Sequence, residues 1–286
     1  MTSESETAGA SAAEPSGRTA SRTLPPIEER EWRQVQWDVS GSGVLSITFD
    51  RPERLNALSF RLLREVHQLV EHARVTDEIR IVTLRGAGTL AFCSGDDLKG
   101  MDPEPGVDSS VTVHHPLITL IRELPKPVVA LVQGWALGHG FELACACDLR
   151  LASDNIEVGD HRVQRAIGLN GGSSWFLPRI VGRALEMLMT GRHLDAEEAL
   201  AWGWANHVFS MDEFDEKAAE YVEMLAALPT VDTGVFKAAV EYSSSHGLRE
   251  SLTNELVVAR RNQGTADAAE GIASFHEKRT PTFIGR

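Results

Sequence analysis

The sequence predicts an α/β fold in which helices cross over between the strands of a layered sheet. Early in the chain two strands, a helix and a third strand follow one another, which is the order of such folds. Farther along, Pro127–Ser153 reads as an apolar strand, a turn with three glycines, a small apolar helix and another strand. The 286 residues, 42% of them hydrophobic, are enough for one large domain, alone or with a small appendage.

Charge and composition exclude several classes of function. The net charge of −13, from 28 basic and 41 acidic residues, argues against general nucleic-acid binding, which needs a basic surface. The sequence has no apolar run of about 18 residues and no signal-peptide pattern, so we expect a cytoplasmic protein without a membrane span. The three cysteines have no metal-binding spacing and are expected to be buried and reduced.

The first part of the chain predicts a tail followed by a hairpin. Residues 1–29 are rich in Ser, Ala, Thr, Glu and Pro, which is typical of a disordered tail. Hydrophobic residues then alternate over Val35–Val39 and Val44–Phe49, on either side of a Gly-Ser turn, which indicates a β-hairpin. Ser59 is a good N-cap for a helix to about Val75, and Ile79–Leu84 follows as a strand.

The middle of the chain predicts two glycine turns and several short elements. Two segments are expected to be irregular: a glycine-containing turn at Phe92–Lys99 and a loop at Pro103–His115. The regular elements expected here, in order, are a helix (Pro116–Leu124), a strand (Val128–Val132), the glycine turn (Gly134–Gly140), a helix (Phe141–Cys147) and a strand (Leu149–Ser153).

The last part is expected to be mostly helical. The expected segments, in order, are a loop (Glu157–Gly172), a helix capped by Ser173 or Ser174, a helix (Ala184–Thr190), a helix capped by Asp195, a strand (Ala205–Phe209) and long helices from Met211 to about His276.

The turn at Gly134–Gly140 has the properties of a site for developing negative charge. Glycines let the backbone approach a ligand closely. The first N–H groups of the following helix have no partner within the helix and carry partial positive charge. They are suited to holding an oxygen that becomes negative during a reaction, and one carboxylate, Glu142, lies in the first turn of the helix.

Two motifs identify a family. Residues 136–144 read ALGHGFELA and are followed by Cys147-Asp148, and residues 92–99 read FCSGDDLK. They resemble the ALGGGxELAxxCD and FxxGADLK segments of the enoyl-CoA hydratase/isomerase, or crotonase, superfamily. Further matches run from about Val44 to the end of the chain, among them Asp50-Arg51-Pro52 and Leu55-Asn56-Ala57-Leu58.

The resemblance implies a crotonase-like spiral of ββα units with a helical C-terminal trimerisation region. The implied domains are a disordered tail at 1–29, a crotonase-like core at 30–210 and a helical region at 211–286. Members of the family are usually homotrimers or dimers of trimers, bind acyl-CoA thioesters and stabilise a thioester enolate with two backbone N–H groups. By position these groups belong to Asp96 and His139, and Glu142 matches a catalytic glutamate that acts as acid and base.

Two departures from the family pattern concern the site. Asp96 and His139 replace the usual small residues. Both side chains could turn to solvent or to neighbouring residues, or His139 could contact substrate or carry a proton. The second glutamate of the hydratases falls on Arg162 when read without gaps, or on Gln164 with a shift. Glu142 could instead cap its helix or pair with Arg162 or Arg165, and an arginine there would keep it ionised.

The resemblance also implies a set of residues that bind the substrate. These are Leu55, Ala57, Ser94, Asp97, Leu98, Lys99, Gly138 and Arg162. Lys278 and Arg279 are expected to reach the coenzyme A of a neighbouring subunit. No metal and no cofactor are implied, since coenzyme A is part of the substrate.

The predicted function is therefore an enoyl-CoA hydratase-like lyase in fatty-acid or other lipid metabolism. The missing second glutamate leaves two alternatives: an enoyl-CoA isomerase or another crotonase-type enzyme, and an acyl-CoA-binding protein that has lost catalysis. Hydration by general acid–base catalysis requires one group that activates water and a second that donates a proton to the α carbon. A single carboxylate suffices for moving a proton in a double-bond isomerisation.

Overall fold

The computed structural model describes residues 26–97 and 114–286. The described residues up to Glu31 belong to one unit, and those from Trp32 to Arg286 form a second. The first unit contributes a short 3₁₀ helix, η1 (Ile27–Glu29). The second unit carries everything described below. Among the described helices, none is both long and apolar enough to cross a lipid bilayer.

A six-stranded sheet forms the centre of the second unit. Its strands, in spatial order, are β1 (Val35–Val39), β2 (Val44–Phe49), β3 (Ile81–Gly86), β5 (Val128–Val132), β7 (Leu149–Ser153) and β9 (His207–Phe209). The first two strands are antiparallel and form the predicted hairpin, with Val35 opposite Phe49. All other pairs are parallel, so each connection between them crosses over and the α/β prediction is confirmed.

A second, short parallel sheet lies beside the first and explains the spiral. It consists of β4 (Ala91–Cys93), β6 (Trp135–Leu137) and β8 (Glu157–Gly159). Along the chain, three strands of the long sheet are each followed by a strand of the short sheet: β3 by β4, β5 by β6 and β7 by β8. A helix comes next in the first two cases, so the predicted ββα units are present.

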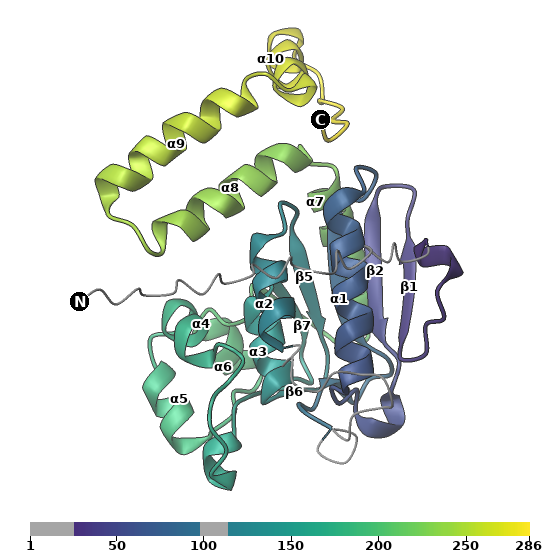
Figure 1. Ribbon diagram of the computed structural model, residues 1–286, viewed down its shortest axis with the longest axis vertical. Helices are drawn as coiled ribbons and strands as arrows, with labels where there is room; N and C mark the ends of the chain where they lie inside the picture. Colours follow the sequence, from purple (N-terminus) through teal and green to yellow (C-terminus); the bar gives the residue numbers. More distant parts are fainter. Residues whose placement is uncertain (1–25, 98–113) are drawn as a thin grey trace, which may run out of the picture. The chain divides into compact units, whose positions relative to one another are not determined.

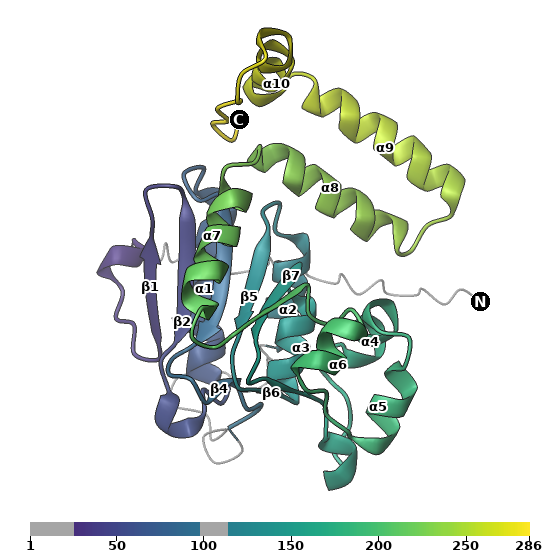
Figure 2. The same cartoon turned by 180° about the vertical axis from the view of Figure 1, so that it is seen from behind.

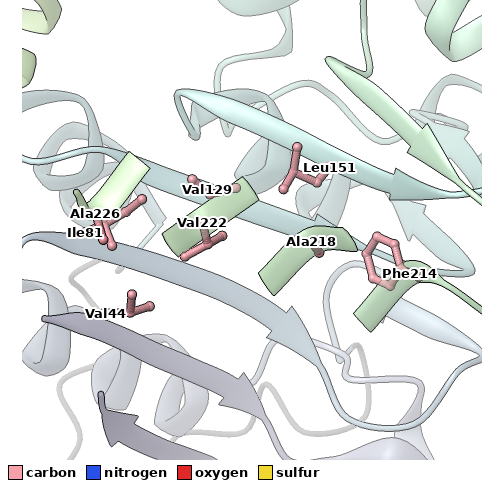
Figure 3. Packing of buried hydrophobic residues seen from close by; sticks show 8 residues of the cluster. All are labelled: Val44, Ile81, Val129, Leu151, Phe214, Ala218, Val222 and Ala226. Carbon is pink, nitrogen blue, oxygen red and sulfur yellow. The ribbon is translucent and has the colours of Figure 1, made fainter. Parts of the chain in front are cut away.

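Helices cover the long sheet on both faces. On one face lie α1 (Phe60–Val75), α2 (His114–Glu123) and α3 (His139–Ala146), as seen from the front in Figure 1. The other face is covered by α7 (Phe214–Ala226), which crosses the strands in Figure 2. Figure 3 shows how α7 packs: its residues Phe214, Ala218, Val222 and Ala226, four apart, contact Val44, Ile81, Val129 and Leu151 of the strands. Residues four apart share one face of a helix, so this face is buried.

The remaining helices extend the fold beyond the sheets. They are η2 (Pro52–Arg54), η3 (Arg162–Arg165), α4 (Ser173–Ile180), α5 (Ala184–Thr190), α6 (Ala196–Ala201), α8 (Thr230–Ser243), α9 (Leu248–Asn262) and α10 (Ala266–Glu277). In both Figure 1 and Figure 2, α8 and α9 run side by side. Arg80 ties this region to the sheet, because it donates to the hydroxyl of Thr230 and to the carbonyl of Phe283.

Most predicted elements agree with the structure, and the exceptions are short. Ser59 caps α1 by accepting from the N–H of Leu62, and Asp195 caps α6 by accepting from Glu198. The glycine turn Gly134–Gly140 is not wholly a turn, since β6 lies within it, and the loop Glu157–Gly172 contains β8 and η3. Three-residue strands are too short to show alternation. The N-cap of α4 is Gly172, not Ser173 or Ser174.

Candidate active site

The candidate site is built at the carboxyl ends of the three short strands. The turn after β4 carries Asp96, the turn after β6 leads into His139 at the start of α3, and the segment after β8 carries Asp160 and Arg162. Because the three strands are parallel neighbours, the segments that follow them meet at one edge of the short sheet.

The turn after β4 is fixed by contacts with the segment before α1. The N–H of Ser94 donates to Leu55, that of Leu58 donates to Gly95 and that of Asp97 donates to Leu58. Two of the predicted substrate-binding residues, Leu55 and Ser94, are thus joined directly.

A partly buried ion pair strengthens this junction. Arg51 Nη2 lies 2.6 Å from Asp97 Oδ2, and the same guanidinium donates to the carbonyl of Ala57. The charges of Arg51 and Asp97 therefore hold together the segments that contain Ala57 and Asp96.

The turn after β6 requires glycine. Gly138 has φ +55° and ψ −123°, a conformation that residues with a side chain rarely adopt. Its N–H donates to the carbonyl of Gly159 in β8, and α3 then starts at His139. A Cβ placed on Gly95 would lie 3.7 Å from the main-chain nitrogen of His139, so the two predicted donor turns are adjacent.

Glu142 is completely buried and one of its oxygens is saturated. Oε1 accepts from the N–H groups of Gly171 and Ser173, at 3.1 and 3.0 Å, and lies 2.8 Å from Nη2 of Arg162. Oε2 accepts no hydrogen bond from the described residues but lies 3.3 Å from Nε2 of His139. The carboxylate is therefore held through one oxygen, and the other oxygen faces the imidazole of His139.

Arg162 and Asp160 form a buried pair that supports Glu142. The guanidinium donates to both oxygens of Asp160, at 2.8 and 2.5 Å, and to Asn170 at 2.6 Å. Burial alone would raise the pKa of Asp160, but the hydrogen bonds and charge of Arg162 outweigh it and lower that pKa. Burial likewise disfavours the charge of Arg162, but Asp160 and Glu142 raise the pKa of this guanidinium. Both groups of the pair are charged at neutral pH.

The side chains of the two predicted enolate-stabilising residues contact each other. His139 Nδ1 lies 2.5 Å from Asp96 Oδ2, and the imidazole is buried, whereas 16% of the Asp96 side chain is exposed. The imidazole therefore lies between the carboxylates of Asp96 and Glu142. Within the first interpretation given above, the His139 side chain is thus turned to its neighbours and not to solvent.

Arg162 and Gln164, the two residues on which the second glutamate could fall, have side chains in different places. Arg162 reaches Glu142, whereas Gln164 donates to the carbonyl groups of Thr190 and Gly191. Arg165 is exposed, so Arg162 is the arginine that pairs with Glu142. Leu98 and Lys99, predicted to bind substrate, lie outside the described residues.

Three groups of the site were not predicted to belong to it: Asp160 and the main-chain N–H groups of Gly171 and Ser173. Asp160 directly follows β8, so recognising that three-residue strand would have placed it at the sheet edge. Gly171 has a steric reason to be glycine, because a Cβ there would collide with Glu142 and His139.

The other charged candidates are placed as follows. Arg279, expected near a neighbour's coenzyme A, forms ion pairs with Glu270 and Glu277 at 2.5 and 2.6 Å. Lys278 ends α10 in the left-handed conformation. Among the described residues, no group of three or more His, Cys, Asp or Glu side chains is arranged to hold a metal ion.

Comparison with known proteins gives a consistent result. The sequence pattern of the family described as enoyl-CoA hydratase/isomerase matches residues 40–286. The chain is 32% identical over 252 residues to 1,2-epoxyphenylacetyl-CoA isomerase of Escherichia coli, covering 85% of this chain and 96% of that one. It is 34% identical over 250 residues to carnitinyl-CoA dehydratase of Proteus mirabilis, covering 85% and 95%. The crystal structure of enoyl-CoA hydratase from Bacillus anthracis superimposes with a TM-score of 0.83 at 32% identity, covering 89% of this chain and all of that one.

Proposed function

This protein belongs to the enoyl-CoA hydratase/isomerase family and is an enzyme of the crotonase type, and from that premise we propose that it forms an enolate from an acyl-CoA thioester and moves a proton with Glu142. The observation that carries the proposal is the environment of Glu142. Glu142 is a fully buried carboxylate. Two main-chain N–H groups hold its Oε1, and its Oε2 faces His139, at the start of α3.

The enolate oxygen is proposed to bind to the main-chain N–H groups of Asp96 and His139. The adjacency of the two turns and the position of His139 at the start of α3 support this assignment. A preorganised N–H donor aimed at a developing oxyanion lowers the barrier by about 3 kcal/mol.

The reaction that this geometry supports best is the isomerisation of an enoyl-CoA double bond. Glu142 takes a proton from C2 of a 3-enoyl-CoA, and the electrons of the C–H bond enter the dienolate. The same carboxyl then returns the proton at C4, which gives the 2-enoyl-CoA with no change in composition. One proton-transferring group is enough for this cycle, and neither Arg162 nor Gln164, on which the second glutamate of a hydratase can fall, is a carboxylate.

Hydration of a 2-enoyl-CoA is a second candidate, and one observation favours it. The imidazole of His139 lies 3.3 Å from Glu142, so a second titratable group is available beside the carboxylate. In this reaction Glu142 would activate the water and a second group would supply the proton to C2.

The acyl-CoA is proposed to enter along the segments that meet at Ser94. Leu55, Ala57, Asp97 and Gly138 surround the two turns and support this path. Leu55 has φ +51°, an unfavourable conformation for a leucine, and such outliers gather at functional sites.

The experiment measures three reactions with the purified protein. These are exchange of the C2 protons of butyryl-CoA in D₂O, isomerisation of a 3-enoyl-CoA and hydration of crotonyl-CoA. We expect exchange and isomerisation by the wild type, and a loss of both by about 10²-fold or more in Glu142→Gln. Glu197→Gln, which alters an exposed glutamate of α6, is the matched control and should behave like the wild type.

The outcomes separate the candidates. Hydration faster than isomerisation would make the protein a hydratase. Tight binding of acyl-CoA without any of the three reactions would mean a binding protein and would overturn the proposal. Activity that survives Glu142→Gln would remove Glu142 from the mechanism.

We also propose a cytoplasmic homotrimer or dimer of trimers that assembles through the C-terminal helices. Large apolar side chains exposed there support it, among them Phe236 on α8 at 66% and Phe275 on α10 at 81%. Interfaces are enriched in such aromatic residues. The molar mass in solution, measured by light scattering, tests this; a monomer of 31.3 kDa would contradict it.

A further inference from the structure

We propose that Asp160 and Ser173 are positioning residues that fix the direction of Glu142 through a closed ring of four hydrogen-bonded residues. This inference rests on the proposed function and adds to it the groups that aim the reactive carboxylate. The ring runs from Glu142 to Arg162, on to Asp160, then to Ser173 and back to Glu142. An ionised carboxylate only accepts hydrogen bonds, so Asp160 acts on Glu142 only through Arg162 and Ser173.

Each joint of the ring is a hydrogen bond between buried groups. Nη2 of Arg162 lies 2.8 Å from Oε1 of Glu142 and 2.5 Å from Oδ2 of Asp160. The same Oδ2 accepts the hydroxyl of Ser173 at 3.0 Å, and the N–H of Ser173 donates to Oε1 of Glu142, also at 3.0 Å. Glu142 and Ser173 are fully buried, and Asp160 and Arg162 are nearly so. One oxygen of each carboxylate thus contacts the same guanidinium and the same serine.

The bond between Ser173 and Asp160 fixes the spacing of the donors that hold Glu142. Oε1 accepts from two segments, because Arg162 follows β8 and Ser173 is the first residue of α4. The hydroxyl of Ser173 joins the start of α4 to Asp160, two residues before Arg162. Donors that are themselves held by further contacts keep a reacting group within about 0.5 Å of its productive position.

Asp160 also sets the plane of the guanidinium. It accepts from both Nε and Nη2 of Arg162, and such a two-point pairing fixes the orientation of an arginine. Nη2 is therefore directed at Glu142. Burial opposes the charge of Asp160, but the hydrogen bonds from Arg162 and Ser173 lower its pKa, so the acceptor that the ring requires is ionised at neutral pH.

The kinetic test measures isomerisation of a 3-enoyl-CoA by Ser173→Ala, Asp160→Asn and the double variant, each shown by thermal unfolding to be folded at the assay temperature. Ser173→Ala removes the hydroxyl and keeps the N–H that Glu142 accepts. We expect kcat to fall by about tenfold in Ser173→Ala and by about 10²-fold in Asp160→Asn, because the carboxylate is misplaced. KM should stay within about twofold of the wild type, since neither residue is proposed to contact substrate.

The double variant tests the closure of the ring. Because the hydroxyl of Ser173 acts through Asp160, removing both should lower kcat no further than Asp160→Asn alone. Independent effects that multiply in the double variant would overturn the ring. So would an unchanged kcat in Ser173→Ala, which decides alone if Asp160→Asn does not fold.

The matched control is Ser174→Ala. Ser174 is the next residue of α4 and is exposed, so this variant should keep the kcat and KM of the wild type. A role of Ser173 in folding alone would lower the unfolding temperature of Ser173→Ala and leave its kcat unchanged, which would contradict the proposal.

A second measurement does not depend on activity. Ser173 begins α4, so its N–H has no partner within the helix and its protection from hydrogen exchange depends on Glu142. The N–H of Gly171 also donates to Glu142. Both groups should exchange slowly in the wild type and in Ser174→Ala, and at least about tenfold faster in Ser173→Ala and Asp160→Asn. Equal exchange in all four proteins would overturn the ring.

The two measurements separate the failure of this inference from the failure of the proposed function. If the wild type turns over no acyl-CoA but the exchange rates change as expected, the proposed function fails and the ring stands. If turnover occurs and both single variants keep the wild-type kcat, the proposed function stands and the positioning role fails.

Discussion

Nη2 of Arg162, one of the two residues on which the second glutamate of the family pattern can fall, lies 2.8 Å from Oε1 of Glu142. The same guanidinium lies 2.5 Å from Oδ2 of Asp160, so Arg162 joins the carboxylate on α3 to the one that follows β8.

The first prediction concerns the stability contributed by Arg162. Arg162→Met leaves two buried carboxylates, Asp160 and Glu142, without their shared cation. Breaking a buried ion pair from one side costs about 3–5 kcal/mol of unfolding free energy. Urea denaturation measures this loss. The control is Arg165→Met, which alters an exposed arginine of the same short helix; equal stability of the two variants would contradict the prediction.

The second prediction concerns acid stability. Arg162 lowers the pKa of Asp160 against the effect of burial, so the folded value lies below the unfolded value. Such a carboxyl contributes stability that is complete above the unfolded pKa, about 3.9, and disappears as the pH falls through the lower folded pKa.

The measurement is the difference in unfolding free energy between the wild type and Asp160→Asn at several pH values. We expect a constant advantage of the wild type at neutral and mildly acidic pH, and a shrinking one below about pH 4. Asp212→Asn, at an exposed position, serves as the control and should show no such trend. An advantage that grows on acidification would have the wrong sign.

The third prediction concerns the space beside Glu142. In Gly171→Ala the added methyl group would collide with Oε2 of Glu142 and lie 2.7 Å from the imidazole of His139. Overpacking of this kind costs about 1–3 kcal/mol, and the displaced carboxylate should lose most of its activity. In Gly168→Ala the new methyl group meets nothing within 4 Å, so stability should change by no more than about 0.5 kcal/mol. Thermal unfolding and α-proton exchange test both variants; equal activity would refute the steric argument.

Elements with a long regular pattern could be predicted from the sequence. The hairpin of β1 and β2 and the strands β5 and β7 have the predicted bounds, because alternation or a continuous apolar run marks each. The helix that became α7 was also expected. The sequence could not predict that α7 covers the second face of the long sheet. Amphipathic spacing shows that one face of a helix is buried, but it does not show which element that face packs against.

The site was only partly predictable for a similar reason. The family motifs locate Glu142, Asp96 and His139 along the backbone. They do not predict the contacts of the Asp96 and His139 side chains, because the family usually has small residues at these two positions. Their contact joins residues 43 positions apart in sequence, which no local pattern encodes. Asp160 was missed because the three-residue strand before it gives no periodic signal.

The distribution of the site over three successive strands of the short sheet has a consequence for synthesis of the protein on the ribosome. Glu142 gains its last main-chain donor from Ser173, more than 75 residues after the turn at Asp96. A nascent chain that has exposed only the segments up to α3 therefore holds Glu142 without these hydrogen-bond donors. The candidate site can assemble only after β8, the segment that follows it and the start of α4 have left the exit tunnel.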